Sequence, residues 1–319
     1  MSTLRVSDIP LVPESPAQRL RRLAAAVRVH FTWWGVHRTL TARQKEEVGV
    51  TYDADARFLT AGKKLVDTRH EAFRRLTALR TLVSNYWRGL TLPYVEVGVR
   101  LIRQNDIEPF VHTLTGFREE LTQAEADLNA VFEEIKADAQ RRLGRLYDPS
   151  DYPPEVRGLF GLDWDFPSVE PPNYLLQIAP EVYEQEQQRI GRRFEQAIEL
   201  AEQAFLGEFA RLVSHLTERL NSTSDGERKV FRDSAVTNLM DFFERFRHLN
   251  VRSNVQLDEL VEQAQRVVQG VGAQELRTSA DLRQHVATQL AGVESALDGL
   301  LVERPRRSLV RNRPNQGGH

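Results

Sequence analysis

The sequence contains no cysteine. This absence excludes disulfide bonds, thiol nucleophiles and zinc sites with thiolate ligands, and a cysteine-free chain fits a reducing compartment. The N-terminus has no signal-peptide core, and no later segment has the roughly 20 consecutive apolar residues of a membrane helix. We therefore predict a cytoplasmic protein that does not enter a membrane.

The sequence also lacks an excess of positive or negative charge, because it has 43 Lys and Arg residues and 45 Asp and Glu residues. Such a balance gives no overall field toward nucleic acid or anionic lipid, so any such role must come from local patches. Hydrophobic residues make up 41% and charged residues 28% of the 319 residues. These proportions are typical of a folded chain that can bury its own core.

The common catalytic motifs are absent as well. Residues 60–64 (TAGKK) lack the first glycine and the hydroxyl residue of a phosphate-binding loop, and neither an HExxH motif nor a GxSxG elbow occurs. His30 and His37 fall on one stripe of a predicted helix together with Trp33 and Trp34. A partly buried helix contact is the simpler interpretation of this stripe, and a metalloenzyme centre is the alternative.

Apolar periodicity predicts an all-α fold. The Ser15–Gln18 segment has the pattern of a capping box, and we expect its helix to continue to about Leu40. A second helical region is predicted over residues 53–90, with Phe73, Leu76, Leu79 and Val83 as its apolar face. Residues 95–99 and 162–166 alternate as strands do, but each is too short to predict a sheet.

A heptad pattern marks the most regular helix. Apolar residues recur every seven positions at Ile107, Leu114, Leu121, Leu128 and Ile135. Residues 107–146 and 180–220 each predict a helix on the order of 60 Å long at about 1.5 Å per residue. We therefore expect an extended antiparallel, coiled-coil-like pair, formed within the chain or with a second copy. Shorter helices at 231–249, 255–268 and 279–301 predict a helical bundle.

These patterns divide the chain into five parts. They are a flexible N-terminus (1–14), an N-terminal helical region (15–146), a connector rich in proline and aromatic residues (147–179), a C-terminal helical region (180–303) and a disordered basic tail (304–319). The aromatic content of the connector predicts an ordered cap on the helical pair rather than a flexible linker. The candidate interaction residues are Trp33, Trp34, Tyr152, Phe160, Trp164 and Phe166.

Two local groups of arginines could contact phosphates. They are Arg245, Arg247 and Arg252 on a phenylalanine-rich helix, and Arg304, Arg306, Arg307, Arg311 and Arg313 in the tail. A nucleic-acid-binding protein is therefore one alternative. A structural network of ion pairs on the helix and a solubilising tail are the simpler interpretation.

Three features together resemble a known family. They are the run FLTAGKKLVDTRHEAFRRLTALR, the long helix after it, and the segment YDPSDYPPEVRGLFGLDWDFPSV. The chain resembles bacterial and phage helical proteins labelled as a domain of unknown function, which are encoded near MoxR-type AAA+ ATPases and von Willebrand A-domain proteins. The resemblance covers about the first two thirds of the chain and implies a non-catalytic scaffold or adaptor that partners such an ATPase, without a cofactor or catalytic residues.

Overall fold

The computed structural model describes residues 14–221 and 234–303. The chain divides into two compact units, one of residues 21–190 and one of residues 1–20 and 191–319. We name the first the sheet unit and the described part of the second the bundle unit. The chain passes between them inside helices α1 (Pro16–Leu23) and α7 (Pro180–Asn221). The connector 147–179 therefore belongs to the sheet unit.

The sheet unit contains two antiparallel sheets, which corrects the prediction of a pure all-α fold. The larger sheet has the strand order β4-β5-β1-β6, and the smaller one pairs β2 with β3. The strands are β1 (Ala24–Trp33), β2 (His37–Thr39), β3 (Gly62–Lys64), β4 (Thr91–Pro93), β5 (Val99–Arg103) and β6 (Phe160–Asp165). Its helices, besides the ends of α1 and α7, are α2 (Ala42–Tyr52), α3 (Glu71–Leu90), α4 (Ile107–Ala130), α5 (Phe132–Leu143) and α6 (Tyr174–Ile178), and short 3-10 turns join some of these elements.

Strand β1 replaces most of the helix predicted to run to Leu40. The predicted start is correct, because the Gln18 N–H donates to Ser15 Oγ at 3.2 Å and the Ser15 N–H donates to Gln18 Oε1 at 2.9 Å. From Val27 to Trp33, however, apolar and polar residues alternate, and β-branched and aromatic side chains favour a strand. The apolar set packs into the core and consists of Val27, Val29, Phe31 and Trp33.

The second predicted helix is shorter than expected. Helix α2 starts at a capping box formed by Thr41 and Gln44, and it ends at Asp53, which adopts a left-handed conformation (φ 51°) where the second helical region was predicted to begin. Gly62 then begins β3, and α3 starts at Glu71. The four predicted apolar residues of α3 are all buried.

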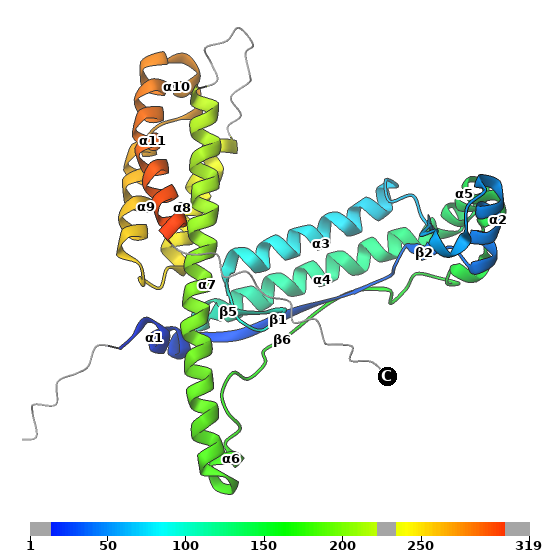
Figure 1. Cartoon of the computed structure of the whole chain (residues 1–319), viewed down its shortest axis with the longest axis horizontal. Helices are drawn as coiled ribbons and strands as arrows, with labels where there is room; N and C mark the ends of the chain where they lie inside the picture. Colours follow the sequence, from blue (N-terminus) through cyan, green and yellow to red (C-terminus); the bar gives the residue numbers. More distant parts are fainter. Residues whose placement is uncertain (1–13, 222–233, 304–319) are drawn as a thin grey trace, which may run out of the picture. The chain divides into compact units, whose positions relative to one another are not determined.

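Helices α3 and α4 lie side by side, and α4 also contacts β6 (Figure 1). Their shared core includes Phe110, Leu114, Leu121 and Leu128, each at most 3% exposed. The heptad edge of α4 is thus occupied inside the sheet unit, and it needs no pairing with the helix at 180–220 or with a second copy. The predicted helix is also interrupted at Val131, between α4 and α5.

The connector folds onto the sheet unit and contributes strand β6. Phe160 lies opposite Trp33 in the register, so the prediction that residues 162–166 are too short for a sheet is wrong. Strand β6 is an edge strand, and carboxylates cover two of its amides. The Phe160 N–H donates to Glu125 Oε1 at 2.9 Å, and the Trp164 N–H donates to Asp163 Oδ1 at 2.9 Å. Satisfied edge amides protect a sheet against unwanted strand addition.

The bundle unit is helical, as predicted. It contains most of α7 together with α8 (Ser234–Leu249), α9 (Val255–Val268), α10 (Ala273–Thr278) and α11 (Ala280–Glu303). Phe205 and Phe209 of α7 pack against Phe242 of α8 at 6.2 and 5.2 Å between ring centroids. Figure 1 shows α8, α9 and α11 alongside the later part of α7. The predicted tail 304–319 and nearly all of the predicted flexible N-terminus lie outside the described residues.

Among residues 14–221 and 234–303, none of the helices combines the length and the apolarity that a membrane crossing requires.

Candidate functional site

Four large apolar side chains are exposed in the short segment where the connector ends and α7 begins. Tyr174, Leu176 and Ile178 of α6 are 60%, 54% and 76% exposed, and Val182 in the first turn of α7 is 44% exposed. We name these four residues the connector patch. Single apolar side chains are ordinary on a protein surface, whereas a cluster marks a binding surface.

The border of the connector patch is acidic. Residues 158–188 include no Lys or Arg but six carboxylates: Asp163, Asp165, Glu170, Glu181, Glu184 and Glu186. Three of these form ion pairs within the sheet unit, with Arg28, Arg21 and Arg189. Glu181 and Glu184, which flank Val182, are exposed. The patch therefore combines an apolar centre with negative charge on one side.

One arginine holds the chain on both sides of the connector patch. Arg21 Nε donates to Glu170 Oε1 at 2.7 Å, and its terminal nitrogen donates to Gln187 Oε1 at 2.5 Å. The hydrogen bond to Glu170 raises the pKa of Arg21. Prolines at positions 171, 172 and 180 fix the backbone torsion φ around α6. The exposed residues are thus presented from a restrained base.

The six candidate interaction residues of the sequence analysis mostly serve the core. Trp33, Trp34, Tyr152 and Phe160 all belong to the sheet-unit core or pack against it. Trp164 is half-buried, with the Arg118 guanidinium 4.8 Å from its ring centroid. The side chain of Phe166 is 41% exposed and adds apolar surface to the connector.

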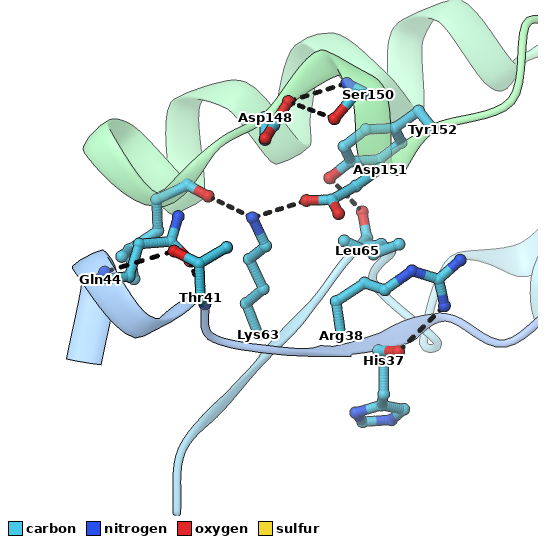
Figure 2. A network of polar contacts seen from close by, with 11 residues as sticks. His37, Arg38, Thr41, Gln44, Lys63, Leu65, Asp148, Ser150, Asp151 and Tyr152 are labelled. Atoms are coloured by element: carbon cyan, nitrogen blue, oxygen red, sulfur yellow. Dashed lines mark hydrogen bonds and ion pairs between the residues drawn. The ribbon is translucent and has the colours of Figure 1, made fainter. Parts of the chain in front are cut away.

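A buried lysine ties the start of the connector to β3 (Figure 2). Lys63 Nζ donates to the Leu146 carbonyl at 2.7 Å and forms an ion pair with Asp151 Oδ2 at 2.6 Å, and its side chain is 4% exposed. Nearby, the Tyr152 hydroxyl donates to the Leu65 carbonyl at 2.9 Å, and burial raises the pKa of Tyr152 to about 12. Because oxygen atoms already engage the Lys63 amine, this network serves structure rather than chemistry.

A cavity of about 400 Å³ lies between the loop after β3 and helix α5. Arg142 donates to Asp67 at 2.6 Å, and this hydrogen bond lowers the pKa of Asp67. Arg69 lies 3.8 Å from the same carboxylate, and Asp138 forms an ion pair with Arg141. The two carboxylates that line this cavity, Asp67 and Asp138, are thus both paired with arginines.

The structure separates the two histidines of the predicted metal stripe. His30 lies on β1, on the opposite face from Trp33, and its Nε2 is 2.8 Å from Asp165 Oδ1. His37 lies on β2 in the other sheet. The stripe assumed a helix, and the strand conformation removes it. Within the described ranges, no group of three His, Cys, Asp or Glu residues is placed to hold a metal ion.

The basic helix residues are engaged within the bundle unit. Arg245 donates to Glu208 at 2.5 Å and lies 5.8 Å from the Phe242 ring centroid, and Arg247 donates to Glu244 at 2.8 Å. Arg252 has a positive φ of 52°, and its N–H donates to Asn250. The five tail arginines, listed in the sequence analysis, lie outside the described residues. The structural network predicted for this helix is therefore confirmed for Arg245 and Arg247.

Sequence reasoning missed the connector patch. It predicted an ordered aromatic cap and named Tyr152, Phe160, Trp164 and Phe166 as candidate interaction residues, but none of the four residues of the connector patch. The usable signal was the apolar segment NYLLQIA between Pro172 and Pro180, inside a stretch without positive charge.

Comparisons with protein-family models, with curated proteins and with solved structures found no match to this chain.

Proposed function

We propose that this chain is a non-catalytic scaffold or adaptor that binds another protein through the connector patch. The supporting observation is the cluster of Tyr174, Leu176, Ile178 and Val182, exposed on a restrained base. Burying one such side chain stabilises a complex by about 1.5–3 kcal/mol before the cost of association is subtracted. Four of them are enough to form the centre of a binding surface.

The partner that this surface fits has an apolar groove with a basic rim. Glu181 and Glu184 would face that rim, and complementary charge speeds association and favours the correct partner. A MoxR-type AAA+ ATPase or a von Willebrand A-domain protein is the candidate partner, on the strength of the family resemblance. The cysteine-free composition supports a cytoplasmic location for the complex.

Nucleic-acid binding is the weaker proposal. Arg245 and Arg247 already pair with carboxylates of the bundle unit, so this function would depend on the tail arginines. The metalloenzyme alternative loses its basis with the separation of His30 from His37.

The proposal is tested by co-purification from native cells with a tagged chain. A variant carrying Leu176→Ser and Ile178→Ser is compared with the wild type by quantitative mass spectrometry. A matched control carries Val50→Ser and Phe58→Ser, at sites that are 85% and 86% exposed outside the patch. We expect the patch variant to recover at least about tenfold less of the specific partner than the wild type does. A loss of about 1.4 kcal/mol of binding free energy produces a change of that size.

A direct binding assay with the purified ATPase then tests the named candidate. Binding of the ATPase to the wild type and to the control, but not to the patch variant, supports the proposal. If the patch variant retains the same partners at wild-type levels, the connector patch is not the docking surface and the proposal fails.

A further inference from the structure

The outer face of α3 has the properties that the connector patch requires of its partner. An open hollow of about 880 Å³ follows this face, lined by Arg69, Glu71, Arg74, Arg75, Thr77, Ala78, Thr81, Leu82 and Asn85. Three arginines and one glutamate line it; Arg75 is paired with Asp127, Arg69 lies 3.8 Å from Asp67, and Arg74 is exposed. Leu82 is 50% exposed and Ala78 is exposed, so the hollow also offers apolar surface. We name these lining residues the α3 groove.

Charge is arranged along the α3 groove in a definite order. Arg69, Arg74 and Arg75 lie at its N-terminal end, and Ala78 and Leu82 lie further along the helix. Arg75 is held by an ion pair with Asp127 of α4, whereas Arg74 is exposed at the surface. The distance along α3 from Arg74 to Leu82 is on the order of 12 Å at about 1.5 Å per residue.

The connector carries the complementary features in the reverse order. Its apolar residues Tyr174, Leu176 and Ile178 come first, and the exposed carboxylates Glu181 and Glu184 follow. An antiparallel alignment therefore places apolar side chains against Ala78 and Leu82 while the carboxylates face the arginines. Such a match of both hydrophobicity and charge fixes the register of an interface as well as its strength.

We propose that the connector patch of one copy docks antiparallel on the α3 groove of a second copy. This inference rests on the proposed function, because it names the protein that the patch binds. The two surfaces differ, so the contact is head-to-tail, and an assembly keeps one free connector patch at one end and one free α3 groove at the other until a ring closes. A scaffold built in this way is an array of copies of the chain.

The inference is tested by sedimentation velocity of the full-length protein over a range of concentrations. The wild type is expected to form dimers and larger species, and their dissociation constant is expected to rise with added salt because charges contribute to the contact. A groove variant (Arg69→Glu with Arg74→Glu) and the patch variant (Leu176→Ser with Ile178→Ser) should each associate at least tenfold more weakly. A control with the same charge change, Arg43→Glu with Arg88→Glu, should associate like the wild type.

Mixing the variants identifies the head-to-tail geometry. The groove variant retains an intact connector patch and the patch variant retains an intact groove, so an equimolar mixture should form a 1:1 heterodimer and stop there. A chain that combines the groove variant with Glu181→Lys and Glu184→Lys should recover self-association, because both charges are exchanged. Circular dichroism establishes that each variant is folded before it is compared.

Two outcomes overturn the inference. The first is a wild type that stays monomeric at every concentration, and the second is a folded groove variant that associates like the wild type. If the wild type is monomeric but the patch variant still loses its partner in the co-purification, the proposed function stands and only the second copy is excluded. If the patch variant behaves like the wild type in both experiments, both proposals fail.

Discussion

The pair formed by Lys63 and Asp151 is a buried polar contact whose loss should be costly. Their side chains are 4% and 19% exposed, so removing one partner leaves the other charge poorly solvated. We expect Lys63→Met to lower the free energy of unfolding by about 3–5 kcal/mol, as measured by urea titration. The neighbouring Lys64 is exposed, and Lys64→Met should change it by less than about 0.5 kcal/mol.

The double variant separates charge from packing at the same site. With Lys63→Met and Asp151→Leu together, no unpaired charge remains and two apolar side chains replace the pair. We expect this variant to be clearly more stable than Lys63→Met alone. Equal stability of the single and double variants would contradict the importance of the ion pair.

We expect the stability of the fold to depend on pH through the carboxyl group of Asp165. Hydrogen bonds from Arg28 and then from His30 lower its pKa from an ordinary value of 3.8 to about 2. A carboxyl group with a lower pKa in the folded state stabilises the fold fully above its unfolded pKa, and this contribution is lost as the pH falls through the folded value. The wild type should therefore lose stability between about pH 4 and about pH 2.

The variant Asp165→Asn removes this titration. Its urea midpoint should be lower than that of the wild type at neutral pH, and it should fall less steeply over the acidic range. The measurement is a series of urea titrations from neutral to acidic pH on both proteins. Parallel curves for the two proteins would show that Asp165 does not titrate as the geometry indicates.

Strand β6 illustrates prediction at the scale of elements. Phe160 is 5% exposed and stands edge-on to Trp33 at 4.9 Å, whereas Trp164 is half-buried. We expect Phe160→Ala to cost roughly 3–5 kcal/mol, and Trp164→Ala to cost about 2 kcal/mol because less of its ring leaves water. Phe166→Ala should cost less than about 1 kcal/mol. Thermal unfolding of the three variants checks this order, and equal, negligible effects would mean that the connector does not pack on the core.

Local patterns predicted some elements well and others poorly. The cap at Ser15 was readable because a capping box involves residues within one turn. The apolar faces of α3 and α4 were readable because each helix repeats its pattern over many residues. Strand β1 was read as a helix because the Ala24–Ala26 run at its start favours helix, and its alternation becomes clear only from Val27 onward.

Tertiary contacts decided what local patterns could not. The heptad edge of α4 has the same spacing whether it meets a second long helix or the core of α3 and β6, so the sequence could not select the partner. Strand β6 exists because β1 lies beside it, and these strands are more than 120 residues apart in the chain. The exposure of the connector patch could not be predicted for a similar reason, because the burial of an aromatic or aliphatic residue depends on segments far away in the sequence.

At the scale of the whole molecule, each unit has a core of its own. The sheet unit packs around Phe110, Leu114 and Phe160, and the bundle unit packs the phenylalanines of α7 against those of α8. Both proposed docking surfaces, the connector patch and the α3 groove, lie within the sheet unit. A variant that weakens the bundle should therefore leave self-association intact as long as the sheet unit remains folded.

Separate cores predict separate unfolding. In differential scanning calorimetry we expect two transitions, because each unit of this size can unfold as a cooperative body. Phe242→Ala removes a side chain that is 1% exposed in the bundle unit, and a loss of about 3 kcal/mol should lower one transition by roughly 5 °C or more. Phe160→Ala should lower the other transition and leave the first in place. Helix α7 runs through both units and could couple their unfolding. If both variants shift one common transition by similar amounts, the two units unfold as one and the prediction is wrong.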